Sequence, residues 1–165
     1  MSTALASIAP TVEWPAIVFD GFEIVPERTE RILIVNESQL VCRVFYNTLS
    51  PTYECFSANS YVEAMECLNL FEFDLIIADV VLADSSPMEL LRQVNCNYPD
   101  TAVIIVSSIP ATDEVSDPVS SDAFGYLTRP CELRVLKLTV ERSLNGRRSS
   151  LERDDRIDRH NCTTH

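Results

Sequence analysis

Short apolar runs alternate with amphipathic stretches from residue 31 to about residue 144. The four clearest runs are residues 31–35, 74–79, 102–106 and 124–128. Runs of this length, rich in Ile and Val, are typical of strands buried on both faces of a parallel sheet. A weaker strand is expected at residues 53–57. The alternation predicts an α/β fold with a doubly wound parallel sheet of five strands.

Between the runs, apolar residues recur at helical spacing. The expected helices are residues 38–49, residues 60–71, a helix that has Ser86 as its N-cap and Pro87 as its first residue, and residues 132–144. The last of these should end near Asn145-Gly146, which is a C-cap signal. The segment 109–122 contains Pro110 and Pro118, so the fourth helix is expected to be shortened, beginning near Asp117.

Polar side chains follow each of the four clear runs. Asn36 and Glu37 follow the first, Asp79 ends the second, Ser107 follows the third and Arg129 follows the fourth. In open α/β sheets, ligands bind in the crevice outside the carboxyl ends of the strands. We therefore expect acids, a hydroxyl and a base to meet at this edge of the sheet.

The length of 165 residues suits one domain, and the sequence predicts three parts. Residues 1–29 show no sustained period and are interpreted as an N-terminal extension with at most a short strand at residues 16–19. Residues 30–145 form the domain. Residues 146–165 have no apolar face, and residues 147–165 mix five arginines with four acids, so a disordered tail is expected.

The net charge of −12 argues against nonspecific binding to nucleic acid or to an anionic membrane, because both favour clustered Lys and Arg. The six cysteines lack the spacing of a zinc site and are interpreted as reduced thiols, several of them on apolar faces. No apolar stretch is long enough to span a membrane, and the N-terminus is unlike a signal peptide. A cytoplasmic protein that binds neither DNA nor membrane is expected.

Four motifs, in order and at usual intervals, resemble the response-regulator receiver domain. They are ILIVNES at residues 32–38, DLIIADVVL at 74–82, AVIIVSS at 102–108 and FGYLTRP at 124–130. The resemblance covers residues 31 to about 144. It implies a flavodoxin-like strand order, 2-1-3-4-5, and a role in two-component signalling. No further domain that could bind DNA is expected after residue 144.

The resemblance also implies roles for individual residues. Asp79 would accept a phosphoryl group from the phosphohistidine of a histidine kinase or phosphotransfer protein. Ser107 would bond that group, and Tyr126 would be the aromatic switch residue. Mg²⁺, which prefers oxygen ligands, would bind Asp79, Glu37 and the backbone carbonyl of Val81, with Asn36 reached through a water. The output would be contact with a downstream protein, so the chain would not be a conventional enzyme.

The sequence also departs from the family pattern. Asn36-Glu37 stands where two aspartates are usual, so the site has two carboxylates and weak Mg²⁺ binding is expected. Arg129 stands in place of the family's lysine, and the two cations are not interchangeable. The alternative is therefore a pseudo-receiver, a constitutive interaction module that does not depend on phosphorylation. Apolar Val81 and Ile109 lie where polar side chains help to position the hydrolytic water, which predicts slow dephosphorylation.

Simpler interpretations of the same residues stay open at this point. Asp79 could be a helix-capping or solvated carboxylate, and Glu37 an acid favoured at a helix N-terminus. Ser107 could be a loop hydroxyl and Tyr126 a half-buried aromatic residue. Arg129 could be a surface cation.

Overall fold

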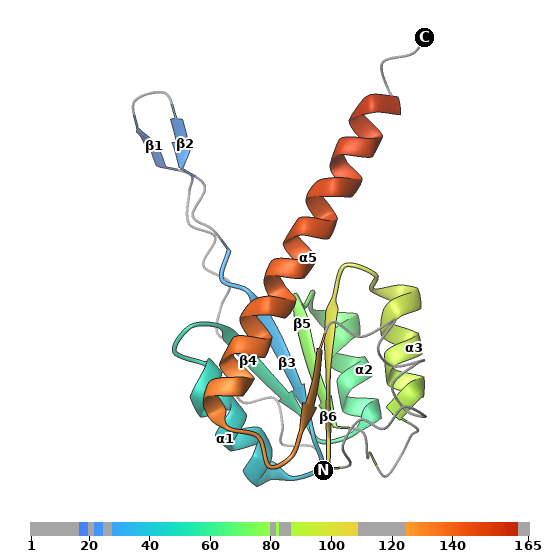
Figure 1. Ribbon diagram of the computed structural model, residues 1–165. Helices are drawn as coiled ribbons and strands as arrows, with labels where there is room; N and C mark the ends of the chain where they lie inside the picture. Colours follow the sequence, from blue (N-terminus) through green and yellow to red (C-terminus); the bar gives the residue numbers. More distant parts are fainter. Residues whose placement is uncertain are drawn as a thin grey trace.

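A five-stranded parallel sheet forms the centre of the protein (Figure 1). The computed structural model describes residues 17–19, 22–24, 28–79, 82, 87–108 and 125–161. The strands of the sheet are β3 Arg31–Val35, β4 Glu54–Ala58, β5 Leu75–Asp79, β6 Ala102–Ser107 and β7 Gly125–Thr128. Their spatial order, β4-β3-β5-β6-β7, with every pair parallel, confirms the predicted order 2-1-3-4-5.

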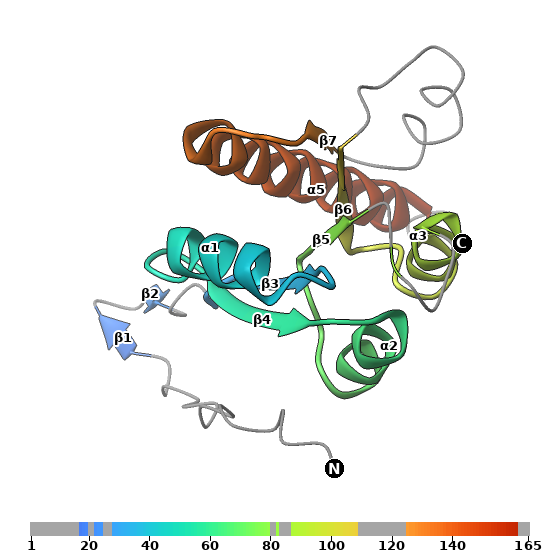
Figure 2. The ribbon, with the colours of Figure 1, turned by 90° about the horizontal axis from the view of Figure 1, so that it is seen from below.

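Helices cover both faces of the sheet (Figure 2). The helices α1 Gln39–Leu49 and α5 Leu133–Asn161 lie on one face, and α2 Tyr61–Leu70 and α3 Pro87–Asn97 on the other. Helix α3 begins at Pro87 as predicted, whereas Ser86 and the predicted fourth helix lie outside the described residues. None of the described helices has the length and apolar character needed to cross a membrane.

Alternation along the central strands divides the core into two layers. On β3, Leu33 and Val35 face the layer of α2 and α3, whereas Ile32 and Ile34 face the layer of α1 and α5. All four side chains are essentially inaccessible to solvent. Burial on both faces explains why these strands are continuous apolar runs in the sequence, without polar alternation.

Helix α5 continues well beyond the predicted end. The C-cap expected at Asn145-Gly146 is wrong, and residues 146–161, expected to be a disordered tail, are helical. Figure 1 shows this continuation running past the edge of the sheet where the strands begin. Arg147 and Arg148 form ion pairs with acids at that edge. These tertiary contacts favour continuation of the helix over the local C-cap signal.

A small hairpin was only partly predicted. Strand β1 Ile17–Phe19 agrees with the expected short strand, and it pairs antiparallel with β2 Phe22–Ile24, which was not predicted. The sequence between them is Asp-Gly, a known signature of two-residue hairpin loops. The division of the chain at residues 29 and 145 stays a prediction.

Candidate functional site

Asp79 occupies the carboxyl end of β5, the middle strand of the sheet. Its side chain is 6% exposed, and both of its oxygens accept hydrogen bonds. Parallel strands end at the same edge of the sheet, so the residues that end or follow β3, β6 and β7 are its neighbours. The structure thus brings Asn36 and Arg129 onto Asp79, with Ser107 at the end of the adjacent strand β6.

Asn36 is held by contacts on both its side chain and its backbone. Its Nδ2 donates to Asp79 Oδ2 at 2.8 Å, and its Oδ1 accepts from the Ser38 backbone N–H at 2.8 Å. Its own backbone N–H donates to the Ala58 carbonyl at 3.1 Å. Because Oδ1 already accepts from a backbone donor, the amide can only present N–H groups to Asp79.

Arg129 places its guanidinium on the same carboxylate. Its Nη2 lies 3.0 Å from Asp79 Oδ2 and 3.2 Å from Oδ1. The backbone N–H of Arg129 donates to the Ser107 carbonyl at 2.6 Å, which ties the residue to the end of β6. Its Nε is buried and has no hydrogen-bond partner among the described residues. The Nε–H group of Arg129 is therefore a donor that Asp79 does not use.

The other predicted residues differ in their surroundings. Ser107 is 2% exposed at the end of β6, and half-buried Tyr126 packs against the core layer of α2 and α3. The Glu37 side chain is exposed. Val81 and Ile109 lie outside the described residues.

Cys42 is a neighbour of the site that sequence reasoning did not single out. Its Sγ donates to the Asn36 carbonyl at 3.2 Å. Burial raises the pKa of the Cys42 thiol, and the nearby charge of Asp79 raises this pKa further. Cys42 is therefore a neutral donor that helps to hold Asn36. Nothing in the sequence indicated this contact.

Comparison with known proteins identifies the family of this chain. The family model of the response regulator receiver domain matches residues 32–141. The chain belongs to the response-regulator receiver family. The alginate biosynthesis transcriptional regulatory protein AlgB of Pseudomonas syringae pv. tomato is 30% identical over 129 residues, which is 78% of this chain and 29% of AlgB. The sensor kinase CckA of Brucella abortus is 35% identical over 98 residues, 58% of this chain and 10% of CckA.

Solved receiver structures share the fold. A CheY-like response regulator receiver domain protein from Methanospirillum hungatei superimposes with a TM-score of 0.69 at 24% identity, over 74% of this chain and 99% of that chain. A response regulator from Thermotoga maritima gives a TM-score of 0.64 at 25% identity, over 72% of this chain and 99% of that chain. At such identities the likeness concerns the fold, so the roles of individual residues in this receiver domain rest on its own geometry.

The described residues do not form a preformed magnesium site. Receiver domains generally bind Mg²⁺ where they are phosphorylated. Here both Asp79 oxygens accept from N–H groups, and Glu37 is exposed. Among the described residues, no group of three His, Cys, Asp or Glu side chains could hold a metal ion. Mg²⁺ at Asp79 would therefore have to share these oxygens with the N–H groups of Arg129 and Asn36 or displace them.

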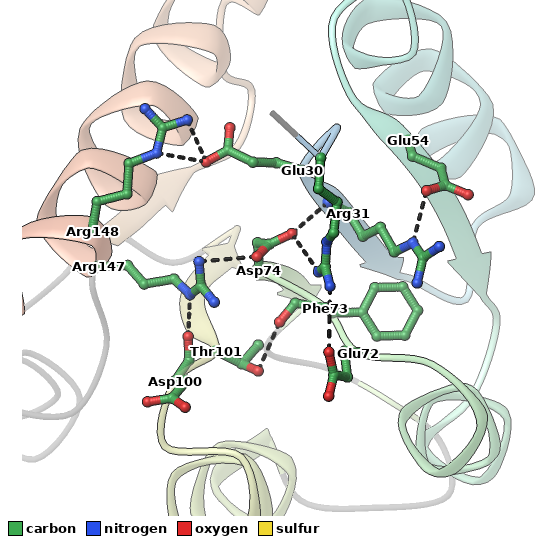
Figure 3. Close-up of polar contacts among 11 residues, drawn as sticks. Glu30, Arg31, Glu54, Glu72, Phe73, Asp74, Asp100, Thr101, Arg147 and Arg148 are labelled. Carbon is green, nitrogen blue, oxygen red and sulfur yellow. Dashed lines mark hydrogen bonds and ion pairs between the residues drawn. The ribbon is translucent and has the colours of Figure 1, made fainter. Parts of the chain in front are cut away.

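A second ionic cluster lies at the opposite edge of the receiver domain, where the strands begin (Figure 3). Asp74, whose side chain is 8% exposed, accepts from Arg28 Nη2 at 3.1 Å, from the Arg31 backbone N–H at 2.7 Å and from Arg147 Nη1 at 2.9 Å. The adjoining cleft has a volume of about 510 Å³ and does not include Asp79. Sequence reasoning missed this cluster because its members are far apart in the chain.

Proposed function

We propose that this receiver domain accepts a phosphoryl group on Asp79 and passes the signal on by protein contact. The observation that carries the proposal is the arrangement at Asp79, a buried carboxylate at the end of the central strand with a guanidinium against both oxygens. Phosphoryl transfer needs an in-line nucleophile and positive charge on the transferred group. Asp79 supplies the nucleophile and Arg129 supplies charge.

The phosphoryl donor would be a phosphohistidine on a histidine kinase or phosphotransfer protein. Ser107, which is buried at the neighbouring strand end, would bond the new phosphoryl group, and Tyr126 on β7 is the proposed switch residue. The net charge of −12 supports a protein, not DNA, as the direct output partner. A cytoplasmic location is part of the same proposal.

The test is intact mass after incubation with acetyl phosphate and Mg²⁺, with Asp79→Asn as the matched control. A single phosphoryl adduct on the parent and none on Asp79→Asn is the expected result. An adduct on both proteins would place the acceptor elsewhere. No adduct on a parent protein whose circular dichroism shows an intact fold would contradict the proposal.

A second candidate function is a phosphorylation-independent interaction module. The contacts from Asn36 and Arg129 to both Asp79 oxygens favour it, because they already satisfy this carboxylate without a ligand. If this alternative holds, Asp79→Asn will bind the downstream partner as tightly as the parent does, whether or not a phosphoryl donor is present.

Dephosphorylation offers a further distinction if the phosphoprotein forms. Val81 and Ile109 are apolar in sequence, and apolar side chains at these positions would hinder the attacking water. We expect slow loss of the adduct, with Val81→Asn and Ile109→Glu accelerating it. Loss within seconds from the parent protein would contradict this interpretation of the two residues.

A further inference from the structure

We propose that Arg129, held on Asp79 together with Asn36, supplies the positive charge that receiver domains generally take from Mg²⁺, so that this site accepts a phosphoryl group without a divalent cation. The inference rests on the proposed function in one respect, the role of Asp79 as acceptor. Its claim about the metal stands on the contacts of Asn36 and Arg129.

The charge balance at Asp79 is the first argument. Among the three side chains in contact, Asn36 carries no charge, and the charges of Asp79 and Arg129 cancel. An acid at position 36 would place a second negative charge within hydrogen-bond distance of Asp79, and a bound cation would relieve the repulsion between the two carboxylates. With asparagine, the two side chains instead share a hydrogen bond of 2.8 Å.

The anchoring of Asn36 is the second argument. Its amide is fixed between Ser38 and Asp79, its backbone N–H donates to Ala58, and its carbonyl accepts from Cys42. A metal ion on Asp79 Oδ2 would meet the N–H face of this amide, which is the electropositive face. Asn36 cannot turn its oxygen toward the ion without losing the bond from the Ser38 backbone.

The unused donor on Arg129 is the third argument. Nη2 contacts Asp79, whereas the buried Nε has no partner among the described residues. Guanidinium groups bind phosphoryl oxygens through two parallel N–H bonds. An oxygen of a phosphoryl group on Asp79 would give Nε the acceptor that it lacks and would keep the cation beside the added negative charge.

The reaction balances without a further reagent. A carboxylate oxygen of Asp79 attacks the phosphorus of acetyl phosphate, and a P–O bond forms. The bond from phosphorus to the acetyl oxygen breaks, and acetate leaves with its electron pair.

The first experiment compares adduct formation in EDTA and in millimolar Mg²⁺ for the parent protein and for Asn36→Asp. We expect the parent's rate to differ by no more than about twofold between the two conditions, whereas Asn36→Asp, with its extra acid, should need Mg²⁺ for at least a tenfold gain. Adducts on the parent only with Mg²⁺ would overturn the inference and leave the proposed function intact. No adduct in either condition would contradict the proposed function.

The second experiment measures the metal directly and does not depend on phosphorylation. Thermal unfolding is followed as MgCl₂ is added, with NaCl at matched ionic strength as the control, because a ligand that binds only the folded state raises its stability. We expect no Mg²⁺-specific change in the melting temperature of the parent and a rise in that of Asn36→Asp. In the double variant Asn36→Asp, Glu37→Gln, this rise should be smaller. An equal rise in the parent would overturn the inference. Arg129→Gln gives an independent check. This single variant removes the guanidinium from Asp79, so its melting temperature should rise when MgCl₂ is added.

Discussion

Gly125 lies on β7 where this strand packs against α5. A Cβ added there would lie 2.9 Å from Thr139 Cγ2, 3.2 Å from Ser143 Oγ and 3.3 Å from Ile104 Cγ1. Thr139 cannot easily turn away, because its Oγ1 donates to the Val135 carbonyl at 2.9 Å. We expect Gly125→Ala to lower the free energy of unfolding by about 1–3 kcal/mol, the usual cost of overpacking.

The matched control for Gly125 is a second substitution that removes the nearest clash. Thr139→Ser deletes Cγ2 and keeps the hydroxyl, so it should restore much of the stability lost in Gly125→Ala. Urea unfolding of both single variants and the double variant measures the coupling. A Gly125→Ala protein as stable as the parent would show that α5 can move away from β7 at no cost.

Single residues of the site were predictable to different degrees. The positions of Asp79, Asn36, Ser107 and Arg129 at strand ends followed from the apolar runs, since parallel strands end at one edge. Their mutual contacts did not follow. The sequence identifies an amide at position 36, but only the structure shows that this amide points its N–H group at Asp79.

At the scale of elements, the strands were easier to predict than the end of α5. β3, β5 and β6 are buried on both faces, so apart from one polar residue at an end of each strand their sequences are apolar and stand out. The continuation of α5 past residue 144 is polar, and its ion-pair partners are Asp74 and Glu30, at least 70 residues earlier in the chain. Local composition therefore indicated disorder where distant ion pairs support a helix.

The two arginines at this point of α5 should contribute unequally. Arg147 is 17% exposed and pairs with buried Asp74, whereas Arg148 is 53% exposed and pairs with Glu30. We expect Arg147→Gln to cost about 1–3 kcal/mol, because it leaves a buried carboxylate without one partner, and Arg148→Gln to cost less than about 1 kcal/mol.

Hydrogen exchange distinguishes a local effect from a global one. In Arg147→Gln, the amides of residues 145–151 should exchange faster than in the parent, while those of β5 and β6 keep most of their protection. Arg148→Gln is the control, because it removes the same charge from the neighbouring position of α5. Equal exchange in the two variants would mean that Asp74 does not hold the continuation of α5.

At the scale of the whole molecule, the doubly wound architecture was predictable, whereas the ion pairs that hold the two ends of the domain were not. The spacing of apolar residues along the chain, and hence which faces are buried, determines the layers. Asp74 then joins three separate parts, because it accepts from Arg28 in the segment that precedes the sheet, from the backbone at the start of β3, and from Arg147 on α5. One buried carboxylate thus links the segments that enter and leave the sheet at the edge opposite Asp79.

Asp74→Ala should consequently be among the most destabilising polar substitutions in this receiver domain. It leaves the Arg31 N–H and two guanidinium groups without their shared acceptor, and breaking a buried ion pair costs about 3–5 kcal/mol. Glu72→Ala is the control, since Glu72 also pairs with Arg28 but is 88% exposed, so its loss should cost less than about 0.5 kcal/mol. Urea unfolding measures the free energy of unfolding of both variants. Near-equal losses of stability would contradict the assigned role of Asp74. Because Asp79 lies at the far edge of the sheet, a folded Asp74→Ala protein should still show the same response to phosphoryl donor as the parent.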